Sequence, residues 1–239
     1  MTAEEKSAIL SKAKHWFTTT IANNHIVNTK KLIDIEEFNL NPFLLKYLAN
    51  YYSGEISARS LAEILILPRV LGTSINTSFG TNFQKFISDV LKGTYGSLIS
   101  GMDIEFTDYL DGVRKYCQIK AGPNTINKDD VTTIVNHFNA AIRLGRTNGV
   151  TLNSSNLFVG VIYGEREDLS GHYYNLERNN HYQVIIGKDF WHRLTGDENF
   201  YKELINAISE IAIEFDSSTL LKGVINELSM SNKLTRLAN

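Results

Sequence analysis

Residues 97–187 combine alternating strand patterns with one strongly amphipathic helix, and this combination restricts the fold more than any other feature of the chain. The stretches SLISGMDIEFTDYL and GVRKYCQIKAG flank Asp111-Gly112, a typical β-hairpin turn. The stretch KDDVTTIVNHFNAAIRLGR then places its apolar residues on one helical face, and the short apolar strands NLFVGVIYG and HYQVIIG follow it. A helix between two strands predicts a parallel, right-handed connection. We therefore expect an α/β fold with a mixed sheet of about five strands.

Helical periodicity flanks this segment on both sides. Residues 1–70 show apolar spacings near 3.6, a loop rich in Gly, Ser, Thr and Asn should follow, and a helix is expected over residues 81–92. The stretch DENFYKELINAISEIAIEF predicts a further helix, and the tail to Asn239 should also be helical. We divide the chain into an N-terminal helical region (1–75), a core (76–190) and C-terminal helices (191–239), packed together as one structural domain.

The composition excludes several classes of protein. The chain has 239 residues, of which 43% are hydrophobic and 21% charged, as in ordinary globular proteins. It has no apolar run long enough to span a membrane, and its N-terminus lacks the apolar core of a secretion signal. The single cysteine, Cys117, cannot form an internal disulfide, which fits a cytoplasmic location. The net charge of −2 neither indicates nor excludes a nucleic-acid-binding protein, because local charge matters more than the total.

The predicted hairpin gathers polar side chains on one face. A two-residue loop at 111–112 would place Asp103 opposite Lys120 and Glu105 opposite Gln118. Neighbours on one face of a strand pair have Cβ atoms about 4.5–5.5 Å apart, so two carboxylates, an amide and an ammonium group should converge. The other face would carry the apolar residues Met102, Ile104, Phe106, Cys117 and Ile119.

This polar cluster contains the groups that phosphodiester hydrolysis needs. Mg²⁺ prefers oxygen ligands and usually takes only one or two carboxylates from a protein. Asp103 would supply a carboxylate, Gln118 its amide oxygen and Ile119 its backbone carbonyl. Lys120 would orient or deprotonate a metal-bound water and offset charge on a phosphate. The alternative is an ordinary solvated sheet face, on which acidic and basic strands often lie side by side.

The arrangement resembles the PD-(D/E)XK nuclease superfamily in the segments SGMDIEF and YCQIKAGPNTINKDD. With IIGKDFWHRLTGD near the C-terminal side, it is similar to type II restriction endonucleases that recognise GGNCC, over about residues 65–215. The resemblance implies a restriction-endonuclease-like core with helical additions. It also implies a Mg²⁺-dependent homodimer that cuts both strands of double-stranded DNA at a palindromic site, within a restriction-modification system that includes a cognate DNA methyltransferase.

Carried over residue by residue, the resemblance assigns the first motif aspartate to Asp103 and the motif lysine to Lys120. The second motif acid is replaced by Gln118, which puts one charge of the metal site in doubt, and Glu105 could restore it. Gln84 lies near the place where related nucleases often have an extra carboxylate, and it too is an amide.

The loop AGPNTINKDD offers possible DNA contacts through Asn124, Asn127 and Lys128. Asparagine can hydrogen-bond adenine or phosphate, and a helix N-terminus favours phosphate. The alternative for the asparagines is a turn and a helix cap. Three functions thus stay open: a site-specific nuclease, a DNA-binding protein on the same fold that has lost cleavage because of Gln118, and an α/β protein without a metal site.

Overall fold

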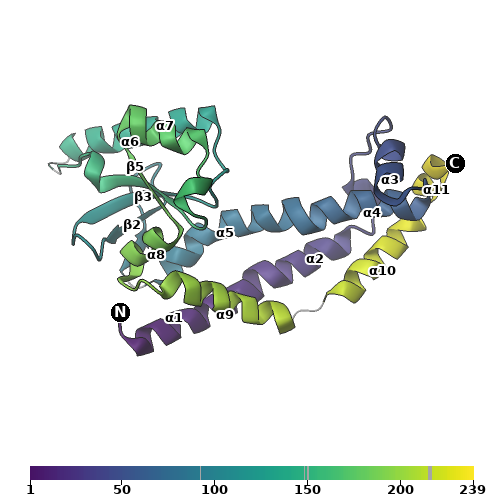
Figure 1. The fold of residues 1–239 in the computed structure, drawn as a ribbon, viewed down its shortest axis with the longest axis horizontal. Helices are drawn as coiled ribbons and strands as arrows, with labels where there is room; N and C mark the ends of the chain where they lie inside the picture. The colour runs from purple at the N-terminus through teal and green to yellow at the C-terminus, as the bar shows by residue number, and fades with distance from the viewer. Residues whose placement is uncertain (92, 148, 150, 215–216) are drawn as a thin grey trace. The chain divides into compact units, whose positions relative to one another are not determined.

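A computed structural model of the protein describes residues 1–91, 93–147, 149, 151–214 and 217–239. The chain forms two compact units (Figure 1). The sheet unit comprises Met1–Lys14 and Gly80–Ser209, and the helical unit comprises His15–Phe79 and Glu210–Asn239. These units do not follow the linear division into 1–75, 76–190 and 191–239, because each unit is assembled from two separate stretches of chain.

The sheet unit is built on a five-stranded mixed sheet with the strand order β1-β2-β3-β4-β5. The strands are β1 (Thr94–Gly96), β2 (Ile104–Thr107), β3 (Arg114–Lys120), β4 (Leu157–Val161) and β5 (Gln183–Ile186). The first three strands pair antiparallel, whereas β4 and β5 continue the sheet parallel to β3. The predicted α/β fold with a mixed sheet of about five strands is confirmed.

Two helices connect the parallel strands. Helix α6 (Lys128–Thr147) leads from β3 to β4, as the sequence predicts, and its buried residues form the expected stripe. Helix α7 (Gly171–Asn180) leads from β4 to β5 and was not predicted, because its polar sequence buries only Tyr173 and Leu176. Both helices lie on the same side of the sheet (Figure 1), and they share one apolar core with strands β4 and β5.

An aromatic cluster fills the opposite face of the sheet. Phe158 of β4 packs edge-on against Phe106 of β2 (5.9 Å between ring centroids) and Phe190 of α8 (6.3 Å). Gly160 leaves room for the Phe190 ring, because a Cβ atom there would lie 2.4 Å from Cε2 of Phe190. The sheet unit also includes α1 (Ala3–Trp16, through Lys14), α5 (Ile75–Val90, from Gly80), α8 (Gly187–Thr195), α9 (Phe200–Glu214, through Ser209), η4 (Ser154–Asn156) and η5 (Arg166–Asp168).

The β2–β3 hairpin differs from the expected register by two residues. Glu105 lies opposite Tyr116, and the N–H of Asp108 donates to the carbonyl of Val113 (3.0 Å), so the turn spans the four residues 109–112 rather than two. Asp108 explains the longer turn. Its buried carboxylate forms an ion pair with Arg193 of α8 and accepts the N–H of Leu110 (2.9 Å). A slip of two residues keeps the side chains of β2 and β3 on their expected faces but changes their partners across the strands. Met102, which precedes β2, instead packs in the apolar core shared with α6, so its expected place beside Ile104 and Phe106 is wrong.

The helical unit confirms the predicted helical character of residues 1–70 within its share of the chain. It contains η1 (Phe17–Ala22), α2 (Asn23–Lys31), η2 (Ile35–Glu37), α3 (Leu45–Ser53), α4 (Ala58–Pro68), η3 (Arg69–Ser74), α10 (Ser218–Ser229) and α11 (Asn232–Ala238). Helices α4 and α10 contribute most of its apolar core. Within the described residues, no helix is both long enough and apolar enough to cross a membrane.

The loop expected after residue 70 is absent from residues 1–91, which the structure describes without a gap. The π-helix η3 continues directly from α4, and α5 begins at Ile75 rather than near residue 81. Pro68 lacks an N–H, so the hydrogen-bond spacing widens beyond it instead of the helix ending there. Arg69 also ties this turn to its own unit: it lies 3.3 Å from the carboxylate of Glu37 and stacks on Phe38.

Candidate active site

Asp103 directly precedes β2 and is held by two hydrogen bonds to β3. Its N–H donates to the carbonyl of Cys117 (2.9 Å), and its Oδ2 accepts the N–H of Ile119 (2.7 Å). Burial raises the pKa of Asp103, while the Ile119 N–H and the nearby Lys120 and His137 lower it in part. No hydrogen bond or ion pair within the described residues occupies its Oδ1. Asp103 is thus a partly buried carboxylate with one oxygen still available.

Gln118 lies under α6 and is 5% exposed. Its Nε2 donates to the carbonyl oxygen of Gly101 and lies 2.7 Å from Nδ1 of His137. A carbonyl can only accept a hydrogen bond, so the Gly101 contact identifies this end of the amide as the nitrogen. The amide oxygen, Oε1, has no hydrogen-bond donor among the described residues. The polar face of β3 is therefore not a solvated sheet face at Gln118.

Ile119 and Lys120 complete the end of β3. Successive residues of a strand point their backbone N–H and C=O groups to alternate edges. Because the N–H of Ile119 binds Asp103, its carbonyl also points toward the edge where Asp103 lies. The Lys120 side chain is half-buried on the same face as Gln118, and its charge acts on Asp103.

The structure thus brings together Asp103, Gln118, Ile119 and Lys120, as the sequence predicts, and adds His137. His137 was missed. The one signal for it was a histidine on the buried face of α6, three residues after Ile134 and four before Ala141.

Glu105 is not brought to Gln118. Its carboxylate pairs with Arg114 at 2.7 Å, and the residue faces Tyr116 across the strands. The expectation that Glu105 lies opposite Gln118 is therefore wrong, and the cause is the four-residue turn. Arg114 also stacks on the ring of Tyr95.

Gln84 lies on α5 one turn after Gly80. A Cβ atom at Gly80 would lie 3.6 Å from the Cβ of Ala121, so this face of α5 approaches the residue next to Lys120. Asn127 is the N-cap of α6: its Oδ1 accepts the N–H groups of Asp129 (2.8 Å) and Asp130 (3.0 Å). Asn124 and Lys128 are exposed at the same end of the sheet unit.

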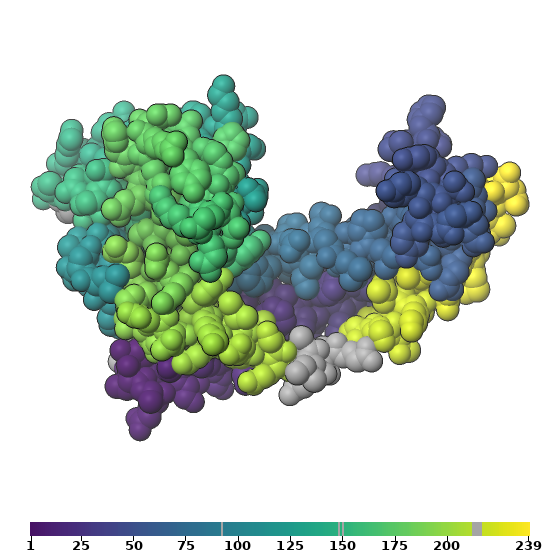
Figure 2. Space-filling view, in the orientation of Figure 1, coloured from purple at the N-terminus to yellow at the C-terminus, as the bar shows by residue number. Residues whose placement is uncertain are grey.

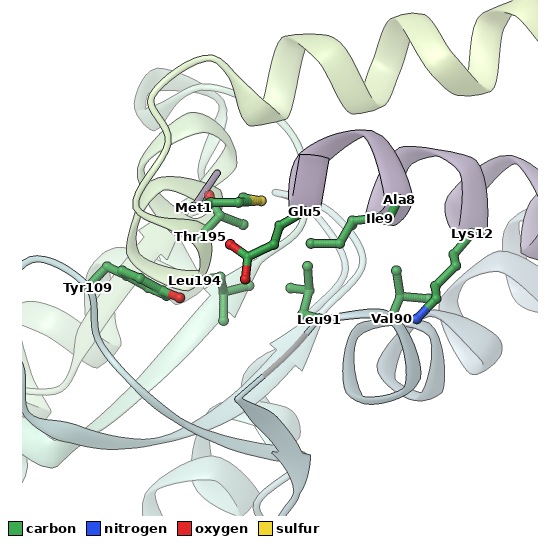
Figure 3. A pocket seen from close by; sticks show the side chains of 10 residues that line it. All are labelled: Met1, Glu5, Ala8, Ile9, Lys12, Val90, Leu91, Tyr109, Leu194 and Thr195. Atoms are coloured by element: carbon green, nitrogen blue, oxygen red, sulfur yellow. The ribbon is translucent and has the colours of Figure 1, made fainter. Parts of the chain in front are cut away.

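A separate pocket of about 170 Å³ lies between α1 and residues 90–91, 109 and 194–195 (Figure 3). Its lining is largely apolar and includes none of the candidate site residues.

The oxygen atoms available as metal ligands at the end of β3 suit a hard divalent cation. They are one carboxylate oxygen of Asp103, the Oε1 of Gln118 and the carbonyl of Ile119, all oxygen atoms of the kind that Mg²⁺ prefers. Across the described residues, no group of three or more His, Cys, Asp or Glu side chains could hold a metal ion. A metal here would consequently depend on a single carboxylate, an amide and the backbone.

Comparison with known proteins identifies the family. A family model described as type II restriction endonuclease EcoO109I matches residues 10–216, and no curated protein matches the chain. The match begins well before residue 65, so the N-terminal helices also belong to the family pattern, although no local motif in them indicated it. Membership excludes the reading of this chain as an α/β protein unrelated to DNA cleavage. The chain belongs to the EcoO109I family of type II restriction endonucleases, enzymes that cut DNA at specific sites.

Proposed function

We propose that the protein is a Mg²⁺-dependent endonuclease that cuts both strands of DNA at GGNCC within a restriction-modification system. The single observation that carries this proposal is the convergence of Asp103, Gln118 and Lys120 at the end of β3 in a chain of this family. Type II restriction endonucleases generally use Mg²⁺. The GGNCC site rests only on the resemblance of the segments around Asp103 and Lys120 and of IIGKDFWHRLTGD.

The chain's own residues divide the work as follows. Asp103, the Oε1 of Gln118 and the carbonyl of Ile119 would hold Mg²⁺. When bound, the metal supplies a more acidic water and positive charge beside the scissile phosphate. The Lys120 ammonium orients the attacking water and stabilises negative charge that develops on the phosphate oxygens. Glu105 has no part in this assignment, because Arg114 already holds its carboxylate.

DNA would reach the site along the loop that follows β3. Asn124 and Lys128 are exposed there and available for phosphate contacts. Asn127 contributes indirectly, because its side-chain oxygen caps α6 and presents that helix N-terminus to a phosphate. Such contacts should make DNA binding weaken steeply as the salt concentration rises.

A homodimer fits a palindromic target, because two-fold symmetry places one active site on each strand. Support for a dimer comes from exposed aromatic residues on α3 and just before it, in the helical unit. Figure 2 draws this segment in dark blue. Phe43, Tyr47 and Tyr51 follow one another at helical spacing and are 91%, 62% and 78% exposed. Exposed aromatic residues at this density are typical of protein–protein interfaces. The Phe43→Ser/Tyr51→Ser variant should therefore sediment as a monomer where the parent sediments as a dimer.

The proposed specificity implies a functional partner in the cell. An enzyme that cuts unmodified GGNCC requires protection of the host's own DNA, so a methyltransferase of the same specificity is its functional partner. Both enzymes would act in the cytoplasm, where the host DNA lies.

Digestion of unmethylated phage DNA tests the proposal. We expect discrete fragments with Mg²⁺, none with EDTA, and ends that all fall within GGNCC when the products are sequenced. Ends at another fixed sequence would refute GGNCC while leaving a specific nuclease. A gel shift without cleavage in Mg²⁺ would instead support a DNA-binding protein inactivated by Gln118.

A further inference from the structure

The surroundings of Gln118 select an amide at this position. The two hydrogen atoms on its Nε2 have two acceptors, the carbonyl of Gly101 and Nδ1 of His137. A glutamate in this place would direct a carboxylate oxygen at the Gly101 carbonyl. His137 could change its tautomer to donate to a carboxylate, but a backbone carbonyl cannot become a donor.

The loop before β2 is shaped to allow this contact. Gly101 has φ +83°, a conformation that favours glycine, and a Cβ atom there would lie 2.4 Å from Cγ of His137. A side chain at residue 101 would thus push the imidazole ring away. Gly101 therefore has two functions: it admits the His137 ring, and its carbonyl receives the Gln118 amide.

Amide orientation matters because only one end of the group can bind a metal. The two oxygens of a carboxylate are equivalent, whereas an amide that turns by 180° presents N–H groups instead of a ligand. With Nε2 held by Gly101 and His137, Oε1 is the end left without a donor from the described part of the chain.

The geometry points to His137 as a positioning residue, which together with the Gly101 carbonyl turns the Gln118 oxygen toward the metal. Gln118 is then an adapted ligand with its own support, not a decayed motif glutamate. This inference rests on the proposed function only in taking the bound group to be a divalent metal. Outer-shell partners of this kind typically change metal affinity about 10- to 100-fold when they are removed.

Two substitutions at residue 137 separate positioning from packing. His137→Leu keeps much of the side-chain volume but removes the acceptor, whereas His137→Asn keeps an oxygen acceptor close to the position of Nδ1 and loses volume. Mn²⁺ affinity is measured by calorimetry in the absence of DNA. We expect His137→Leu to weaken binding about 10- to 100-fold and His137→Asn to stay near the parent. His172→Leu, at an exposed histidine of α7, is the matched control and should change nothing.

A second measurement needs no metal. The chain has three glutamines, so glutamine-specific ¹⁵N labelling gives three side-chain amide signals, from Gln84, Gln118 and Gln183. The Gln118 signal should show two protected hydrogens in the parent and lose that protection in His137→Leu. Metal-free Gln118→Glu should also unfold at a lower temperature than the parent, because a carboxylate faces the Gly101 carbonyl.

The outcomes are separable. Equal Mn²⁺ affinity in the parent and His137→Leu, or stronger loss in His137→Asn than in His137→Leu, would overturn the positioning role. If the parent binds no divalent metal and cuts no DNA, the proposed function fails; the amide signals then still decide whether His137 holds Gln118.

Discussion

Replacing Asp103 by asparagine should have opposite effects on function and on metal-free stability. The substitution keeps an oxygen that can accept the Ile119 N–H (2.7 Å in the parent) but removes the site's carboxylate charge. Burial raises the pKa of Asp103, because its ionised carboxylate is solvated less well in the folded protein than in water. At neutral pH this ionised carboxylate therefore destabilises the metal-free folded state. The metal-free Asp103→Asn protein should therefore unfold at a higher temperature than the metal-free parent.

The sign of the pH dependence follows from the same shift. The ordinary pKa is 3.8 and the folded value is higher, so between the two the folded state holds more protons than the unfolded state. The stability of the metal-free parent should accordingly fall as the pH rises through this interval. Asp103→Asn should lack this contribution, and the exposed Asp89→Asn substitution serves as the control.

Added metal should reverse the order of stability. At a concentration one hundred times its Kd, a ligand that binds only the folded state stabilises it by about 2.7 kcal/mol. For a chain of 239 residues, each kcal/mol raises Tm by about 2–4 °C, so Mg²⁺ should raise the parent's Tm by roughly 5–11 °C. Differential scanning calorimetry with EDTA or Mg²⁺ measures both effects. A comparable Mg²⁺ shift in Asp103→Asn, or a metal-free variant less stable than the parent, would refute this account of Asp103.

Three further substitutions test the rest of the site. Lys120→Ala should abolish cleavage but leave the unfolding temperature and the DNA affinity near those of the parent, because the half-buried side chain faces the site. A cleavage rate within about tenfold of the parent, which corresponds to about 1.4 kcal/mol of activation free energy, would contradict its role. Glu105→Gln should leave cleavage nearly unchanged and lower the free energy of unfolding by only roughly 0.2–1 kcal/mol, the contribution of a partly exposed ion pair with Arg114. Loss of cleavage in a variant that stays folded would show that Glu105 takes part in catalysis. Gly101→Ala should displace the His137 ring and weaken Mn²⁺ binding as His137→Leu does, and unchanged affinity would show that the ring tolerates the methyl group.

Much of the sheet unit could be predicted because its signals are local. Alternation in β3, the Asp111-Gly112 turn and the apolar stripe of α6 each depend on neighbours in sequence. The side chains of β2 and β3 were assigned to the correct faces although the predicted register was wrong, because a slip of two residues preserves the alternation of side chains. The length of the turn could not be predicted, because it depends on Asp108 meeting Arg193 from a distant helix.

The residues that converge at the candidate site were predicted, but the residues that support them were not. Asp103 directly precedes β2, and Gln118 and Lys120 lie on the adjacent strand β3, so their convergence follows from strand pairing. His137 reaches Gln118 only through the packing of α6 on the sheet. Gly101 leaves room for the His137 ring and adopts a positive φ angle. Neither fact can be read from spacing. The same limit explains the interleaved units, which arise when the C-terminal helices return to pack against α4.

An anomalous-scattering map of crystals grown with Mn²⁺ tests the central claim most directly. We predict a metal peak roughly 2.0–2.2 Å from a carboxylate oxygen of Asp103, the Oε1 of Gln118 and the carbonyl oxygen of Ile119, with the Gln118 nitrogen still bound to Gly101 and His137. A metal bound elsewhere, or one at this site that leaves Gln118 uncoordinated, would contradict the proposed amide-ligated active site.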